Sequence, residues 1–113
     1  SRVIRFPGGA TMRIQETTTG DIACLAVAGS LDLFTHTTLR RHVDRLLEQG
    51  HSHLQLDLGE TERLDVTGLG SLVSVVRKLR DRQGSLRIVA ASKPVERILH
   101  LVNIRCLLPI CPS

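Results

Sequence analysis

Hydrophobic residues follow two different spacings along this chain, and the two spacings alternate. From Ile22 to Ala28 nearly every residue is apolar, which is typical of a central strand covered on both faces. Between His53 and Leu58 three leucines alternate with polar residues, which indicates a strand with one buried face. The same reasoning predicts further strands at Met12 to Thr18 and Ser85 to Ala90.

Between these strands, apolar residues recur every three or four positions, which predicts helices. The first helix is expected after Thr35 or Thr37, whose side chains suit an N-cap, and Gly50 ends it as a C-cap glycine. The last helix is expected from Ser92 to Asn103. The apolar stripes that we expect to be buried are Leu39, Val43, Leu46 and Leu47 in the first helix and Val95, Ile98, Leu99 and Val102 in the last.

The second helix is expected to begin near Thr67 or Gly68, within the segment Leu64 to Leu72, and to end before Gly84. This segment lies where a strand end meets a helix N-terminus. Unpaired backbone N–H groups and the positive end of the helix dipole meet there, so the position suits an anion or a phosphorylated hydroxyl. The expected buried stripe of this helix is Leu69, Leu72, Val73, Val76 and Leu79.

The order of elements predicts the architecture. A short strand over Cys106 to Ile110 completes the order β-β-α-β-α-β-α-β. Beyond the opening pair, strands alternate with helices, which predicts parallel pairing with right-handed crossovers. A length of 113 residues fits a single domain over residues 1–113. Ser1 to Thr11 are expected to be either leader residues ahead of Met12 or an extra N-terminal strand at Arg2 to Phe6.

Composition narrows the classes of function. The longest apolar run, Ile22 to Gly29, is far too short to span a bilayer, and the N-terminus lacks the apolar core of a signal peptide. We therefore expect no membrane partner. The three cysteines are odd in number and form no C-x-x-C pair, which indicates a reducing, cytoplasmic compartment rather than a disulfide framework.

The formal net charge is +4, and part of it is concentrated on the second helix and its exit. The chain has no Trp or Tyr and only two Phe, so it lacks the stacking platform that nucleic-acid binding uses. A solvated helix face is therefore favoured over a nucleic-acid site, and an acidic protein partner stays open. The clustered basic residues are Arg77, Lys78, Arg80, Arg82 and Arg87.

Candidate catalytic and metal-binding groups are few. No Ser-His-Asp order or nucleophile elbow is present. His51 and His53 have the spacing of a metal pair but supply only two ligands, which favours an exposed turn. Gly68 and Gly70 lack the lysine of a phosphate-binding loop. We expect no enzymatic activity, no cofactor and no metal site.

The element order and two motifs together resemble the STAS domain family. The likeness runs from about Met12 to Ile110. It implies a STAS-type α/β fold, in which a mixed β-sheet carries helices mainly on one face. STAS domains usually add a final helix after the last strand, so a chain that stops at Ser113 is expected to be either truncated or a short variant. The motifs are Gly29-Ser30-Leu31-Asp32 after the second strand and Asp65-Val66-Thr67-Gly68-Leu69-Gly70 at the second helix.

The family comprises bacterial anti-sigma factor antagonists and the cytoplasmic tails of sulfate transporters. Antagonists bind a kinase-type anti-sigma factor and free a sigma factor. The anti-sigma factor inactivates them by phosphorylating a serine directly after the motif aspartate. Here that position is Val66, which has no hydroxyl, so the resemblance leaves Thr67 as the candidate phosphoacceptor. Thr67 is alternatively a helix N-cap.

The resemblance implies a regulatory protein-binding module. Its partner is expected to be a kinase-type anti-sigma factor or another protein, and an oligomer stays open. The alternative is a ligand-sensing or scaffolding module of a larger signalling or transport complex. Asp32 and Asp65, at two adjacent strand ends, either flank the site or cap the two helices. The expected partner-binding residues are Asp32, Asp65, Val66, Thr67, Gly68, Leu69, Gly70 and Leu72.

Overall fold

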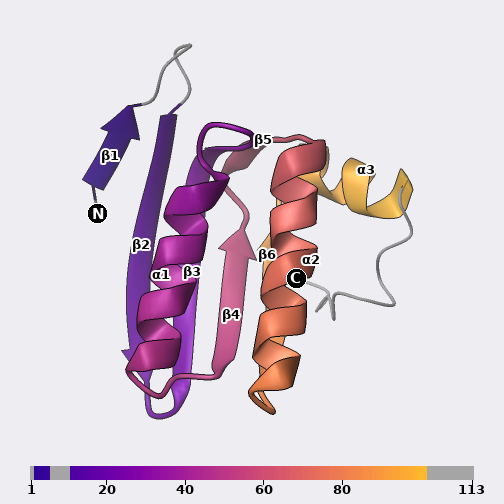
Figure 1. The fold of residues 1–113 in the computed structure, drawn as a ribbon. Helices are drawn as coiled ribbons and strands as arrows, with labels where there is room; N and C mark the ends of the chain where they lie inside the picture. The colour runs from indigo at the N-terminus through magenta and orange to yellow at the C-terminus, as the bar shows by residue number, and fades with distance from the viewer. Residues whose placement is uncertain (1, 6–10, 102–113) are drawn as a thin grey trace.

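The computed structural model describes residues 2–5 and 11–101, which form one β-sheet and three helices (Figure 1). The predicted strand at Cys106 to Ile110 and the end of the last helix lie outside the described residues. The described elements are β1 (Arg2–Arg5), β2 (Thr11–Thr19), β3 (Ile22–Leu31), α1 (His36–Glu48), β4 (His53–Leu58), β5 (Thr61–Leu64), α2 (Val66–Asp81), β6 (Ser85–Ala91) and α3 (Lys93–Leu101).

The sheet is mixed, as predicted. Its strand order is β1-β2-β3-β4-β6, and β5 pairs with β3 off this path. The pairs β1–β2 and β2–β3 are antiparallel, whereas β3–β4, β4–β6 and β3–β5 are parallel. α1 and α2 lie side by side over one face of the sheet, and α3 lies beyond its upper corner (Figure 1). The predicted placement of helices mainly on one face is therefore confirmed.

The prediction that β3 is covered on both faces is wrong. Ala23, Leu25 and Val27 are buried beneath the helices. Cys24 and Ala26, which alternate with them, are only partly buried, because no described helix covers the opposite face of the sheet. Small apolar side chains on that second face made the strand look buried on both sides.

The helical stripes are largely confirmed. All four expected residues of α1 are buried, as are Val95 and Leu99 of α3. Ile98 is partly buried, and Val102 lies outside the described residues. In α2, however, Val73 is only partly buried and Val75 takes its place in the core. α2 contacts α1 as well as strands β5 and β6, and this packing turns its buried stripe toward α1.

Strand β5 (Thr61–Leu64) was not predicted. Its sequence, Thr-Glu-Arg-Leu, is too short and too polar to show an alternation. The strand is held by its position beside the second half of β3, where Gly29 pairs with Thr61 and Leu31 with Leu64. The buried hydroxyl of Thr61 also donates a hydrogen bond to the Val27 carbonyl at 2.7 Å.

Both long helices end in a Schellman motif. After α1, the N–H groups of Gly50 and His51 donate to carbonyls of the last turn at 3.0 and 2.9 Å. Gly50 has a φ of 92°, which confirms the predicted C-cap glycine. After α2, the N–H groups of Gln83 and Gly84 make the equivalent bonds at 2.9 and 2.7 Å. Gln83 therefore takes the left-handed position, with a φ of 59°.

Gln83→Gly is expected to raise the free energy of unfolding by about 0.5–1 kcal/mol, because glycine adopts the left-handed conformation without a Cβ penalty. Urea denaturation measures the change. Gln49→Gly is the matched control, since Gln49 precedes the equivalent position with an ordinary φ of −82° and should gain nothing. An unchanged or lower stability of Gln83→Gly would show that the left-handed residue carries no strain.

Candidate functional site

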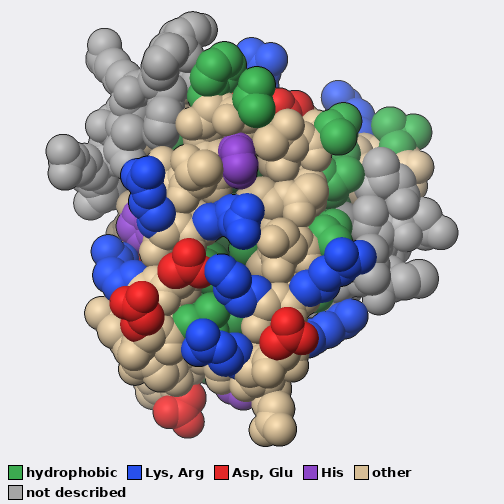
Figure 2. All heavy atoms as spheres, viewed as in Figure 1, with side chains coloured by type: hydrophobic (Ala, Val, Ile, Leu, Met, Phe, Trp, Pro, Cys, Tyr) green, Lys and Arg blue, Asp and Glu red, His purple; other side chains and the backbone are tan. Residues whose placement is uncertain are grey.

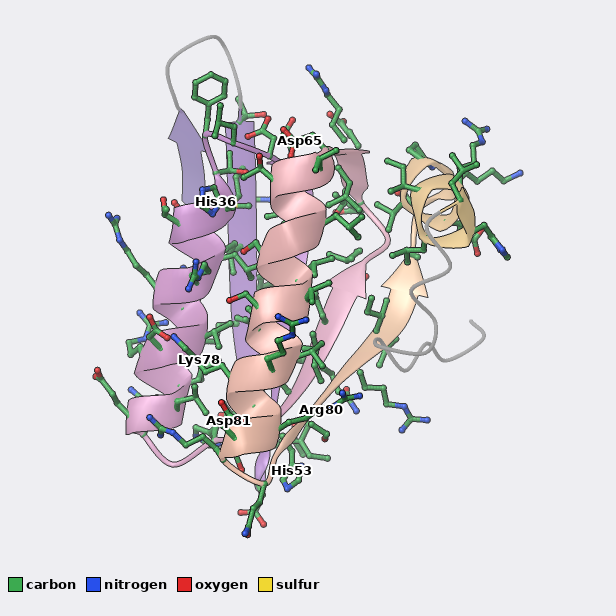
Figure 3. All side chains as sticks on the ribbon, turned by 45° about the vertical axis from the view of Figure 1, so that its right-hand side comes forward. His36, His53, Asp65, Lys78, Arg80 and Asp81 are labelled. Carbon is green, nitrogen blue, oxygen red and sulfur yellow. The ribbon has the colours of Figure 1, made fainter. Side chains whose placement is uncertain are left out.

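The motif residues Asp32 and Asp65 leave the sheet at the same edge. β3 and β5 are neighbouring parallel strands whose last residues, Leu31 and Leu64, are paired in register. The N–H of Asp65 donates to the Leu31 carbonyl at 3.3 Å, which joins the two strand ends. Figure 3 shows Asp65 at the upper end of α2, while His53 lies at the opposite end of the sheet. The two motifs are thus brought together as predicted.

Asp65 is the N-cap of α2. One carboxylate oxygen accepts a hydrogen bond from the N–H of Gly68 at 2.8 Å. The other accepts from the N–H of Leu33 at 3.2 Å, so the side chain links the helix to the loop after β3. The helix consequently begins at Val66, and the alternative that Thr67 is the N-cap is wrong. The negative charge of the Asp65 carboxylate also interacts favourably with the positive end of the helix dipole.

Asp32 organises the loop that leads into α1 instead of capping that helix. Its carboxylate accepts from the N–H groups of Phe34 and Thr35 at 2.9 and 3.2 Å. Thr35 holds the N-cap position, but its hydroxyl points back and donates to the Ser30 carbonyl at 2.8 Å. These bonds are buried or partly buried, so they fix the loop in one conformation.

Large apolar side chains are exposed at this edge. Val66 is 85% exposed, Leu33 60% and Phe34 47%. Leu69, about one helical turn after Val66, is partly buried and packs against the core. Figure 2 shows hydrophobic side chains at the upper end of the molecule and down one flank of α2. Lys and Arg spread over the middle and lower part of the helices, and a few also lie at the upper edge. We call Leu33, Phe34, Val66 and Leu69 the α2-head surface.

Sequence reasoning did not predict Leu33 and Phe34. The available signal was their place directly after Asp32, where two large apolar residues precede a helix in a segment with no strand or helix spacing. The hydrogen bond from Leu33 to Asp65 brings this loop against the head of α2, and it joins two residues that lie 32 positions apart in the sequence.

Gly68 and Leu72, which are among the expected partner-binding residues, are buried and expose no side chain at the α2-head surface. Leu72 is fully buried in the core. Gly68 is buried because the helix crosses close to β3, and a Cβ there would collide with the Leu31 carbonyl oxygen. Thr67 is partly buried, whereas Gly70 is exposed with open space around it.

The described residues offer little reactive chemistry. Within residues 11–101, no cluster of three or more His, Cys, Asp or Glu side chains is placed to hold a metal ion. His53 forms a hydrogen bond between its Nδ1 and the Ser85 hydroxyl at 3.0 Å. Burial raises the pKa of the Cys24 thiol, and the nearby Asp57 carboxylate raises it further, so this thiol is not an activated nucleophile. The described helices also lack the length and apolar character that a bilayer crossing requires.

Comparison with known proteins gives a consistent picture. The model of the STAS domain family matches residues 13–113. The anti-sigma-B factor antagonist of Bacillus subtilis is 27% identical over 84 residues, which cover 74% of this chain and 76% of that protein.

Solved structures agree in fold. An anti-sigma factor antagonist from Mycobacterium paratuberculosis superimposes with a TM-score of 0.79 at 22% identity, covering 90% of this chain and 86% of that one. A putative anti-sigma factor antagonist from Thermotoga maritima gives a TM-score of 0.76 at 20% identity, covering 88% and 86%. At these identities the likeness shows the shared fold.

Proposed function

We propose that this chain, which belongs to the STAS domain family, acts as an anti-sigma factor antagonist. In this role it binds a kinase-type anti-sigma factor through the α2-head surface. The names of its relatives support this role. The observation that carries the proposal is the exposure of Val66 at the head of α2 and of Leu33 and Phe34 in the loop that Asp65 holds to it. The binding of a partner protein, and not catalysis, is the function that this site supports.

The physical basis is the cost of exposed apolar surface. A cluster of large apolar side chains in water is unfavourable, and such clusters mark protein-binding sites. The loop is held by the Asp32 and Asp65 hydrogen bonds, so the surface is preformed and little conformational entropy is lost on binding.

We further propose that this protein lacks the phosphorylation switch. Val66 occupies the first helical position of α2 and has no hydroxyl. The family resemblance assigns the acceptor serine to this position. Thr67 follows it on the helix, about 100° further around the axis, and is partly buried. A kinase aligned on the Val66 position does not meet the Thr67 hydroxyl in line. The protein then stays competent to bind its partner.

Val66→Glu is expected to weaken binding of the cognate anti-sigma factor by about 2 kcal/mol or more, roughly 30-fold, because it places a charge in the apolar contact. The fold should survive, since Val66 is exposed and a carboxylate is favourable in the first helical turn. Leu69→Asp is a less clean test because Leu69 also packs against the core. Isothermal titration calorimetry measures the affinity.

Ile22→Glu is the matched control for this change. Ile22 is also an exposed apolar residue, 43% exposed, and it pairs with His53 at the far end of the sheet. Its replacement should leave the affinity unchanged. Equal affinities of wild type and Val66→Glu would place the interface elsewhere, and an equal loss in both variants would indicate a non-specific effect of charge.

A further inference from the structure

The outer face of α2 is hollowed directly below the α2-head surface. The hollow has a volume of about 480 Å³. It exists because Gly70 has no side chain, and a Cβ at that position would meet no atom within 4 Å. The residues that line it are Val66, Leu69, Gly70, Val73, Ser74 and Arg77. Its walls are therefore mostly apolar, and a cation closes its lower end.

Arg77 is available for a new ion pair. It is exposed, and it has no ion-pair partner among the side chains that the structure describes. Its neighbour Lys78 differs, because Lys78 Nζ lies 2.6 Å from the Asp44 carboxylate of α1. Val66, Gly70, Val73 and Arg77 follow one another at helical spacing, so they form a single stripe along the outer face.

Helices α1 and α2, together with the C-cap residue of α2, carry a net charge equal to that of the whole chain. Residues 36–48 and 66–82 contain seven basic and three acidic residues, a net charge of +4, which equals that of the complete chain. All other residues together sum to zero. A positive field over this face attracts an acidic partner and raises its association rate. Neither helix contains a Phe, Tyr or Trp and acidic residues are interspersed, which disfavours a nucleic acid.

We propose that this hollow seats an acidic, amphipathic helical segment of the partner. An apolar side chain of that segment fills the space over Gly70, and a carboxylate pairs with Arg77. Gly70 and Arg77 are seven residues apart, about 10 Å along the axis, so the partner presents the two groups about two helical turns apart. The inference rests on the proposed function and specifies the chemistry of the partner that the function requires.

Two variants test the two contacts against the cognate kinase-type anti-sigma factor. Arg77→Glu should weaken binding by about tenfold and reduce its dependence on salt, because it removes the ion pair and places like charges together. Arg41→Glu makes the same change in net charge on the exposed face of α1, outside the hollow, and should alter the affinity by less than about twofold.

Gly70→Leu tests the apolar contact without endangering the fold. The open space accommodates the side chain, and leucine is a better helix former than glycine, so the melting temperature should rise. Because the new side chain fills the hollow, binding should weaken by at least about tenfold. A variant that is more stable and yet binds poorly cannot be explained by unfolding.

The outcomes separate this inference from the proposed function. If Val66→Glu loses binding while Arg77→Glu and Gly70→Leu bind like wild type, the inference is overturned and the proposed function stands. If the wild-type chain binds no anti-sigma factor, the proposed function fails. The inference is then decided by a peptide titration in which NMR signals are the readout. The probe is a helical peptide with Leu and Glu two turns apart. The control is the same peptide with Gln in place of Glu.

In that titration, the amide signals of Gly70 and Arg77 should shift with the Glu peptide. The Gln peptide keeps only the apolar contact, so at the same concentration it should shift both signals less. The absence of any shift, or equal shifts with both peptides, overturns the proposed carboxylate contact. Binding of duplex DNA or of anionic vesicles with the same Arg77 dependence, in place of the peptide, likewise overturns it.

Discussion

Gly68→Ala is expected to lower the free energy of unfolding by about 3 kcal/mol, whereas Gly70→Ala is expected to raise it by about 1 kcal/mol. The two glycines belong to one motif and lie in the same turn region of α2. Their environments are opposite, so the same chemical change should have opposite effects.

Gly68 permits close contact between α2 and the sheet. A Cβ at this position would lie 2.8 Å from the Leu31 carbonyl carbon and 2.9 Å from Leu64 Cδ1, and it would overlap the Leu31 carbonyl oxygen. The Leu31 carbonyl also accepts from Asp65, so relief of the clash displaces both motif loops. At Gly70 there is open space, and alanine only restricts the unfolded chain and improves helix propensity.

Urea denaturation of both variants measures the difference, with an unchanged slope confirming that the midpoint reports stability. A Gly68→Ala variant as stable as wild type would mean that α2 moves away from β3 at little cost. In that case close packing of α2 on β3 would not require glycine at position 68.

Val66→Ser is expected to create a phosphorylation site, whereas the wild-type chain is expected to remain unmodified. Incubation with the cognate kinase and ATP should add one phosphate to the variant, detected by intact mass. The hydroxyl would stand at an 85% exposed position, immediately after Asp65, so a kinase can reach it. Val66→Ala, which also lacks a hydroxyl, is the control and should remain unmodified.

Phosphorylation of the variant should then abolish partner binding. The phosphate adds roughly two negative charges directly after Asp65, whose carboxylate holds the loop that carries exposed Leu33, so docking must desolvate a dianion in an apolar contact. Unphosphorylated Val66→Ser should bind nearly as well as wild type. Stoichiometric phosphorylation of the unmutated chain, mapped to Thr67, would falsify the proposal that the switch is missing.

The local features of this protein follow from its sequence. Leu54, Leu56 and Leu58 alternate with the period of a strand. Glycine at position 50 readily adopts the left-handed conformation that ends α1. The family motif at Asp65 identified the edge of the sheet where the candidate site is proposed. These features depend on interactions between residues a few positions apart, which is why spacing and capping rules predict them.

Tertiary packing decided the rest. Sequence spacing places Leu72 and Val73 in the same stripe, but only contact with α1 and the sheet buries Leu72 and leaves Val73 at the hollow. Strand β5 exists because β3 extends past β4 and offers it a partner. The two glycines look equivalent in the motif, and they differ because one faces the Leu31 carbonyl and the other faces solvent. Each of these outcomes depends on atoms that are distant in sequence and adjacent only in the folded chain.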